Sequence, residues 1–227
     1  MLQILIDATY DTLRIVFIAT VFTVLIGGPL GIFLEASQNE HILEKKYLWL
    51  HKSLCYTINF FSNIPVFLIL IIMMPIINKI LHNHFSIELA AVIALIFIGI
   101  FSFANDVFKT LNSLPKELSD TAKFLGAEAM QVLTKFLLPE AMQNLIKDIT
   151  KLVINFIGLS IIASALGISG LGKLALEKGG YNDLETLELS YVVWAILLST
   201  SSIYIVKSLS NYIISSIAVK IKDKDSE

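Results

Sequence analysis

The chain has 227 residues, of which 56% are hydrophobic and 16% are charged, and its mean hydropathy is +0.76. Soluble domains average about 45–50% apolar and 25% charged residues, so this composition excludes a soluble globular domain and predicts an integral membrane protein. The formal net charge of -2 gives no basic surface for nucleic acid, and the single cysteine, Cys55, excludes a disulfide framework or a cysteine-rich metal site.

The N-terminal segment, residues 1–14, precedes the first uncharged run and lacks the basic region and small-residue cleavage site of a signal peptide. We therefore expect the first span to be retained. Within that span Gly27 and Gly31 have the spacing that lets another helix approach closely. Pro29 lies between them and is typical of a bend, so helix packing and a hinge are both open interpretations.

Five uncharged runs follow one another along the chain, and each is long enough to cross a hydrocarbon core about 30 Å thick at a rise of about 1.5 Å per residue. Each must be helical, because lipid offers the backbone no hydrogen-bonding partner. We therefore expect an all-α integral membrane protein with about five transmembrane helices. The predicted spans are residues 15–34, 53–78, 87–105, 152–172 and 189–206; the uncharged run of the third span begins at Leu89, after Glu88.

The orientation follows from the 17 lysines and arginines, because cytoplasmic loops carry the excess of positive charge. With five spans the connecting segments alternate between the two sides of the membrane. One side has only Arg14, Lys79, Lys173 and Lys178, whereas the other side has the remaining 13. We therefore expect the N-terminus outside and residues 207–227 as a cytoplasmic tail. The 13 lysines are Lys45, Lys46, Lys52, Lys109, Lys116, Lys123, Lys135, Lys147, Lys151, Lys207, Lys220, Lys222 and Lys224.

The polar segment between the third and fourth spans, residues 112–147, is predicted to form two short helices. Ser113 is a suitable N-cap with Pro115 in the first turn, and Gly126 is a natural C-terminal stop. A second helix is expected over Glu128–Leu137, ended by Pro139. Such a pair favours either a docking element or a solvated connector on the membrane surface. The apolar residues with helical spacing are Leu114, Leu118, Ala122, Leu125, Val132, Leu133 and Phe136.

This segment resembles the EAA loop of ABC-importer permeases, in which a Glu-Ala-Ala triplet precedes a glycine and a Leu-Pro pair follows. The similar stretches are Ser119–Gly126 and Phe136–Ala141. Asp120 replaces the glutamate and Thr121 the first alanine, whereas Ala122, Gly126, Leu138 and Pro139 match. The resemblance implies that these six residues couple the chain to a cytoplasmic ATPase, on the side that the lysine count assigns.

Three other stretches are similar to permease subunits of methionine importers: Thr23–Gly31, Asn63–Leu70 and Ala165–Gly172. Relatives have four glycines where this chain has Gly167, Ile168, Ser169 and Gly170. The resemblance implies a type-1 ABC permease domain over residues 10–206, moving an amino acid, with methionine as the expected cargo, across the bacterial cytoplasmic (inner) membrane by alternating access.

The same resemblance implies the partners: two copies of an ABC-type ATPase, a second copy of this chain, an extracytoplasmic substrate-binding lipoprotein and membrane lipid. ATP and magnesium would be bound by the ATPase, so this chain needs no cofactor and is not an enzyme. A homodimer is expected because five helices are few to enclose a path. Polar residues that could line it are Ser62, Asn63, Asn155, Ser160 and Ser164, with helix–helix hydrogen bonding as their alternative role.

Other motifs carry little weight. The stretch Gly167–Lys173 nearly spells a phosphate-binding loop, but position 174 is Leu where Ser or Thr would hold magnesium. His82 and His84 lack a third ligand and are expected to be solvated rather than metal-binding. The absence of a charged residue within the five runs disfavours a membrane enzyme. A permease for another amino acid or small organic solute, and a passive channel or membrane scaffold, remain alternatives.

Overall fold

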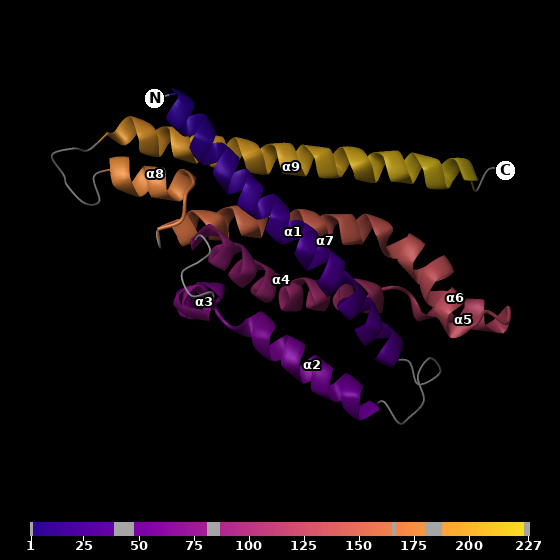
Figure 1. The fold of residues 1–227 in the computed structure, drawn as a ribbon. Coiled ribbons are helices and arrows are strands. Elements are labelled where there is room, and N and C mark those ends of the chain that lie inside the picture. The colour runs from indigo at the N-terminus through magenta and orange to yellow at the C-terminus, as the bar shows by residue number, and fades with distance from the viewer. Residues whose placement is uncertain (1, 39–47, 81–86, 165–166, 180–187, 225–227) are drawn as a thin grey trace. The chain divides into compact units, whose positions relative to one another are not determined.

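In the computed structural model the described residues are 2–38, 48–80, 87–164, 167–179 and 188–224, and within these ranges the regular structure is entirely helical. The all-α prediction is therefore confirmed for the described part of the chain. The elements, in chain order, are α1 (Leu2–Gln38), α2 (Leu48–Asn63), α3 (Val66–Ile80), α4 (Ile87–Asn112), α5 (Lys116–Phe124), α6 (Ala129–Gln131), the π-helix η2 (Val132–Leu137), α7 (Leu138–Ser164), α8 (Leu171–Lys178) and α9 (Leu189–Lys224) (Figure 1).

Three of these helices are long and apolar enough to cross a membrane: Leu2–Ser37, Glu88–Asn112 and Leu189–Val219. A fourth is added if the broken pair α2 and α3 counts as one span. The described helices therefore support a multi-pass membrane protein, while length and composition alone yield fewer spans than the five that the uncharged runs predict.

Two of the predicted spans are interrupted. The span predicted at 53–78 is split because α2 ends at Asn63 and α3 begins at Val66; Pro65 disfavours a helical backbone at the residue before it. The span predicted at 152–172 is wrong as a single helix, because α7 ends at Ser164. Gly167 and Gly170 adopt φ values of +102° and +144°, which a right-handed helix cannot contain.

The two terminal helices extend beyond the predicted spans. Helix α1 begins at Leu2, so the described part of the N-terminal segment continues the first span as helix. Helix α9 continues from Leu189 through Lys224, so residues 207–224 prolong the fifth predicted span without a break. A charged residue ends an uncharged run in the sequence, but it does not end a helix, because lysine and glutamate are good helix formers. A helix ends where a cap, a glycine or a proline interrupts its backbone hydrogen bonds.

The chain divides into two compact units. The first unit contains Met1–Phe22, Ile64–Gly99 and Thr150–Leu209, and the second contains Thr23–Asn63, Ile100–Ile149 and Ser210–Glu227. One core of the first unit joins α1, α8 and α9, and one core of the second joins α1, α2 and α4. The buried residues of these cores are Leu5, Ala8, Leu171, Leu174, Tyr191 and Ala195 in the first unit, and Leu34, Ile58 and Ala104 in the second.

Within the second unit, the glycines of α1 lie directly against the backbone of α4. A Cβ atom on Gly27 would lie 2.9 Å from the Ile100 carbonyl oxygen. On Gly31 it would lie 2.5 Å from the Ala104 carbonyl oxygen and 2.8 Å from Val107 Cβ. The packing interpretation of this glycine pair is therefore confirmed, because only residues without a side chain permit so close an approach.

Candidate functional site

The segment that resembles a coupling loop begins with helix α5, which ends in a glycine turn as predicted. Gly126 has φ +80°, and the Ala127 amide donates to the Ala122 carbonyl oxygen at 3.1 Å. This bond closes a Schellman motif, in which the left-handed residue after the helix lets the chain turn while satisfying a terminal carbonyl. Because a left-handed position suits glycine best, Gly126 fixes the end of α5.

The second short helix differs from its prediction. Its start is capped, since the Glu128 amide donates to Gln131 Oε1 at 3.2 Å. The predicted stop at Pro139 is wrong, because the π-helix η2 runs directly into α7, with Pro139 in the first turn of α7. Proline has no N–H to donate to the preceding turn, and a change of helical type is a place where that loss is accommodated.

The N-cap prediction for Ser113 is also wrong. Helix α5 begins at Lys116, and the Ser113 hydroxyl donates to the Thr110 carbonyl oxygen at 2.7 Å. Ser113 therefore satisfies a carbonyl at the end of α4 rather than an amide at the start of α5. The turn between the two helices is closed by the Leu114 amide, which donates to the Leu111 carbonyl oxygen at 3.2 Å.

The six residues of the coupling motif divide by burial. Ala122 is fully buried where α5 packs against η2. Leu138 is half-buried, and its amide donates to the Leu133 carbonyl oxygen. The other four, Asp120, Thr121, Gly126 and Pro139, are exposed. Ala122 and Leu138 thus hold the segment together, while the other four stand at its surface.

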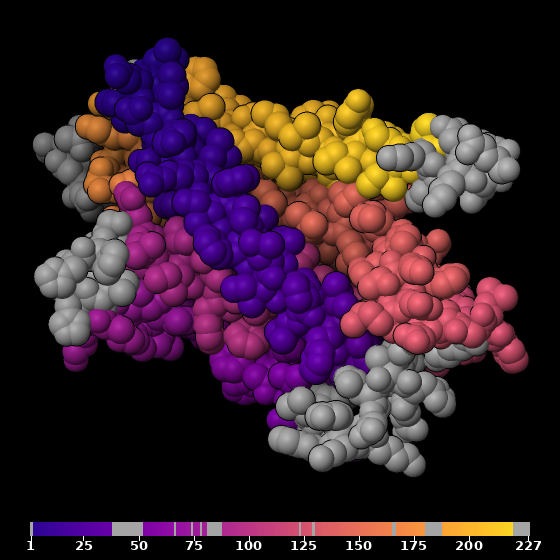
Figure 2. Space-filling view, turned by 45° about the vertical axis from the view of Figure 1, so that its right-hand side comes forward, coloured from indigo at the N-terminus to yellow at the C-terminus, as the bar shows by residue number. Residues whose placement is uncertain are grey.

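Three large apolar side chains, which the motif does not single out, are exposed around the same turn. Phe124 is 93% exposed, Leu125 75% and Met130 67%. Figure 2 shows the salmon-coloured side chains of this segment at the surface. Sequence periodicity assigned Leu125 to a buried helix face; it lies instead in the turn that Gly126 makes, where helical periodicity no longer applies.

A hydrogen bond between α4 and α7 lies at the base of this segment. Thr110 Oγ1 donates to Asp148 Oδ2 at 2.6 Å, and both side chains are half-buried. A hydrogen bond to a carboxylate is shorter and stronger than one between neutral groups. All of α5, α6 and η2 lies between these two residues in the chain, so the bond joins the two ends of the segment.

Three of the five residues proposed for the translocation path point into their own protomer. The Ser62 hydroxyl lies 2.6 Å from the Ile58 carbonyl oxygen and 3.0 Å from that of Phe101, which links α2 to α4. Ser160 and Ser164 are buried and donate to carbonyl oxygens of α7, at Ile157 and Ser160 respectively. Only the Ser62 bond to Phe101 joins two helices, whereas the Ser160 and Ser164 bonds stay within α7.

The other two, Asn63 and Asn155, are exposed. Asn63 Nδ2 donates to the Asn59 carbonyl oxygen at 2.7 Å, which leaves its side-chain oxygen as an acceptor at the surface. An exposed amide on an apolar helix can bind a polar solute when a second protein surface covers it. Of the five predicted residues, these two are therefore the ones whose side chains are exposed in this chain.

The glycine-rich stretch after α7 is held by Thr12 of the first unit. The Leu171 amide donates to Thr12 Oγ1 at 3.0 Å, and Thr12 Oγ1 donates to the Ala8 carbonyl oxygen at 2.9 Å. A Cβ on Gly170 would lie 2.8 Å from Thr12 Oγ1 and 3.1 Å from Ser164 Oγ. The first amide of α8 is thus already bonded within the protein, which argues further against a phosphate-binding loop here.

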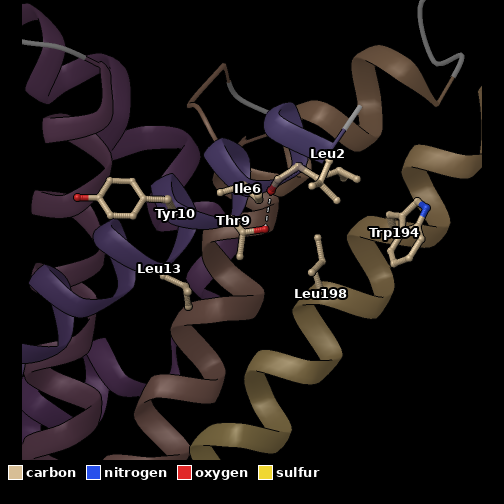
Figure 3. Close-up of a pocket in the computed structure, with 8 residues that line it drawn as sticks. Leu2, Ile6, Thr9, Tyr10, Leu13, Trp194 and Leu198 are labelled. Atoms are coloured by element: carbon tan, nitrogen blue, oxygen red, sulfur yellow. Dashed lines mark hydrogen bonds between the residues drawn. The ribbon is translucent and has the colours of Figure 1, made fainter.

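An open apolar groove of about 520 Å³ lies between the start of α1 and α9 in the first unit (Figure 3). The hydroxyl of Thr9, one of two tyrosine or threonine hydroxyls among the lining residues, donates to the Leu5 carbonyl oxygen at 2.7 Å. A groove with no charged lining residue suits hydrocarbon and offers nothing to the ammonium and carboxylate groups of an amino acid. The lining residues are Leu2, Leu5, Ile6, Thr9, Tyr10, Leu13, Trp194 and Leu198.

Among the described residues, no group of three or more His, Cys, Asp or Glu side chains could hold a metal ion. His82 and His84 lie outside the described residues.

Comparison with known proteins gives a consistent picture. A family model described as "Binding-protein-dependent transport system inner membrane component" matches residues 27–218. A probable D-methionine transport system permease protein MetI of Pasteurella multocida is 33% identical over 187 residues, covering 82% of each chain. The D-methionine transport system permease protein MetI of Escherichia coli K12 is 30% identical over 161 residues, covering 70% of this chain and 72% of its own.

Solved structures agree with these relatives. A chain of the MetNI methionine ABC transporter, in inward facing conformations, superposes with a TM-score of 0.83 at 25% identity, covering 96% of this chain and 97% of its own. An amino acid ABC transporter with histidines superposes with a TM-score of 0.74 at 15% identity over 94% of both chains. The second likeness supports the fold alone.

Proposed function

Because this chain belongs to the family of binding-protein-dependent transport system inner membrane components, we propose that it is the permease subunit of an ATP-driven methionine importer. The named relatives that support the cargo are D-methionine permeases, and a structural neighbour that covers 96% of this chain is part of a methionine ABC transporter. The chain is a transport component rather than an enzyme, and a separate ATPase subunit hydrolyses ATP.

The observation that carries the proposal is the glycine-closed turn between α5 and α6, with the coupling-motif residues around it. Asp120, Thr121, Gly126 and Pro139 are exposed there, and Ala122 and Leu138 hold the segment together. Movement of the ATPase is transmitted through these six residues. A passive channel or scaffold would have no use for such a segment.

The remaining assignments are part of the same proposal. Five spans cross the inner membrane with the N-terminus outside. The type-1 permease domain covers residues 10–206, and within it segment 112–147 is cytoplasmic. Residues 207–227 form the cytoplasmic tail. The chain works as a homodimer with two ATPase subunits, which bind the ATP and magnesium, and an outer binding protein delivers cargo. The path lies between two copies. Exposure supports the assignment of Asn63 and Asn155 to cargo contact, and the hydrogen bonds of Ser62, Ser160 and Ser164 support a structural role beside the path.

The alternating movement needs helices that move as rigid bodies. The close contact of Gly27 and Gly31 with α4 supports such a movement in the second unit, because the two backbones touch and cannot slide independently. An uncharged path suits a zwitterionic cargo, which carries no net charge to be balanced by the protein.

The proposal is tested by tagging this chain, solubilising the membrane in mild detergent, and asking whether an ATPase co-purifies in equal stoichiometry. A Gly126→Arg variant, which puts a long side chain at φ +80°, should lose the ATPase while remaining folded. The cargo is tested by uptake of labelled methionine into proteoliposomes with other amino acids as competitors. Absence of an ATPase from the folded wild-type complex would make the importer assignment wrong.

A further inference from the structure

The most exposed large apolar side chains of the coupling segment lie around its turn, while Met142 farther along, in α7, is 44% exposed. Phe124, Leu125 and Met130 lie within seven consecutive residues, and each is more than half exposed. The inward apolar residues of α5 behave differently, since Ala122 is fully buried and Leu118 is half-buried. A phenylalanine side chain 93% exposed is unfavourable in water, so a partner is expected to cover it.

A membrane surface is a poor fit for this turn. A helix that lies in the lipid interface presents an apolar stripe along its whole length. Helix α5 instead exposes Lys116, Glu117 and Asp120 along its length, and it exposes a large apolar side chain only at its last residue, Phe124. Within the described residues from α5 to η2, the large exposed apolar side chains therefore gather at the tip, as a small protrusion suited to a pocket.

The surroundings of the turn match the anatomy of a protein–protein interface, in which an apolar centre is enclosed by a polar rim. Glu117, Asp120, Glu128 and Lys135 are all exposed and carry both signs of charge. Aromatic residues and methionine are enriched at the centre of such interfaces, where a few side chains contribute most of the affinity.

We propose that Phe124 is the main anchor of this chain on its ATPase, with Leu125 and Met130 completing an apolar tip that enters a pocket on the ATPase surface. The inference rests on the proposed function and assigns a different role to the motif residues. Ala122 and Gly126 shape the turn, whereas Phe124, Leu125 and Met130 make the contact.

The test measures the affinity of purified ATPase for this chain reconstituted in lipid nanodiscs. Phe124→Ala should weaken binding by at least about 30-fold, the factor that separates a dominant interface residue from its neighbours. Phe124→Leu, which keeps apolar volume, should recover most of the affinity. Phe17→Ala is the matched control, because Phe17 is 69% exposed on α1 outside the segment and its loss should change affinity less than about twofold.

The possible outcomes distinguish a failure of the Phe124 proposal from a failure of the importer proposal. Thermal unfolding in detergent should be unchanged in Phe124→Ala, because an exposed side chain contributes little to the folded state. If wild type binds the ATPase, Gly126→Arg does not, and Phe124→Ala binds as wild type does, the anchor is wrong and the importer stands. If wild type itself does not bind, the proposed function is wrong. Met130→Ala provides a second measurement, with a smaller loss expected.

Discussion

Thr110 donates a hydrogen bond to Asp148 at 2.6 Å, and the whole of α5, α6 and η2 lies in the chain between these two residues. The bond therefore closes a loop whose ends belong to the two long helices α4 and α7. Under the proposed coupling, a push at the turn around Gly126 would reach both helices together, because this bond links the end of α4 to α7.

Removing this bond should uncouple hydrolysis from transport. Thr110→Val keeps the shape of the side chain but leaves Asp148 Oδ2 without this donor, which costs about 1–2 kcal/mol at a half-buried site. We expect ATPase binding to be retained and the number of ATP molecules hydrolysed per methionine imported to rise. Thr110→Ser keeps the donor and should behave as wild type. Equal stoichiometry in the valine and serine variants would contradict this role.

The contact between α1 and α4 should be intolerant of a single methyl group. Gly31→Ala would place a Cβ 2.5 Å from the Ala104 carbonyl oxygen, and we expect a destabilisation of about 1–3 kcal/mol from overpacking. Gly28→Ala is the matched control, because its Cβ would meet only Phe103 Cε1 at an ordinary 3.7 Å. Unfolding temperatures in detergent measure the difference. Similar unfolding temperatures for Gly31→Ala and Gly28→Ala would contradict this prediction, because α1 and α4 would then accommodate the extra methyl group without loss of stability.

The glycine turn offers a test of backbone conformation apart from side-chain size. Gly126→Ala should cost about 1–2 kcal/mol at φ +80°, whereas Gly126→Asn should cost less, because asparagine tolerates the left-handed region. No atom lies within 4 Å of a Cβ on either Gly126 or Gly158, so neither substitution to alanine causes a clash. Gly158→Ala lies inside α7 and should stabilise by about 0.5–1 kcal/mol. Hydrogen exchange at the Ala127 amide measures the turn directly.

The Thr12 contact should tolerate serine but not valine. Thr12→Val leaves the buried Leu171 amide unsatisfied, which costs about 1–3 kcal/mol. Thr12→Ser keeps the acceptor and should lose little. Thr9→Val is a suitable control, because Thr9 bonds only within its own helix, to the Leu5 carbonyl oxygen. The three unfolding temperatures should rank serine and the control close to wild type, with Thr12→Val clearly lower.

Hydropathy predicted the helical class and the multi-pass character, because lipid requires every backbone group to be bonded within its own helix. Helix ends were predicted less well. Uncharged runs were used as helix limits, yet α9 passes Lys207 and continues to Lys224. Conversely, the run from Leu152 to Gly172 is broken by Gly167 and Gly170, whose backbone geometry hydropathy does not register.

The candidate site was predictable where a local sequence signal points to a single backbone conformation. Gly126 was identified from its place after a helix, and its φ of +80° agrees. Phe124 was not singled out, because the helical spacing that identified Leu118 and Ala122 leaves it off the inward face, and a spacing pattern does not tell which outward residue a partner covers. Thr12 was missed as well, since no local pattern connects a threonine in α1 with an amide 159 residues later.

That separation has a consequence for how the protein is made. Ribosomes add about 5–20 residues per second, so on the order of ten to thirty seconds pass between synthesis of Thr12 and synthesis of Leu171. During that interval α1 enters the membrane before α8, which packs against it in the folded protein, has been synthesised. Assembly of the first unit is therefore completed late, and a chain arrested before residue 171 would display the Thr12 face to the insertion machinery.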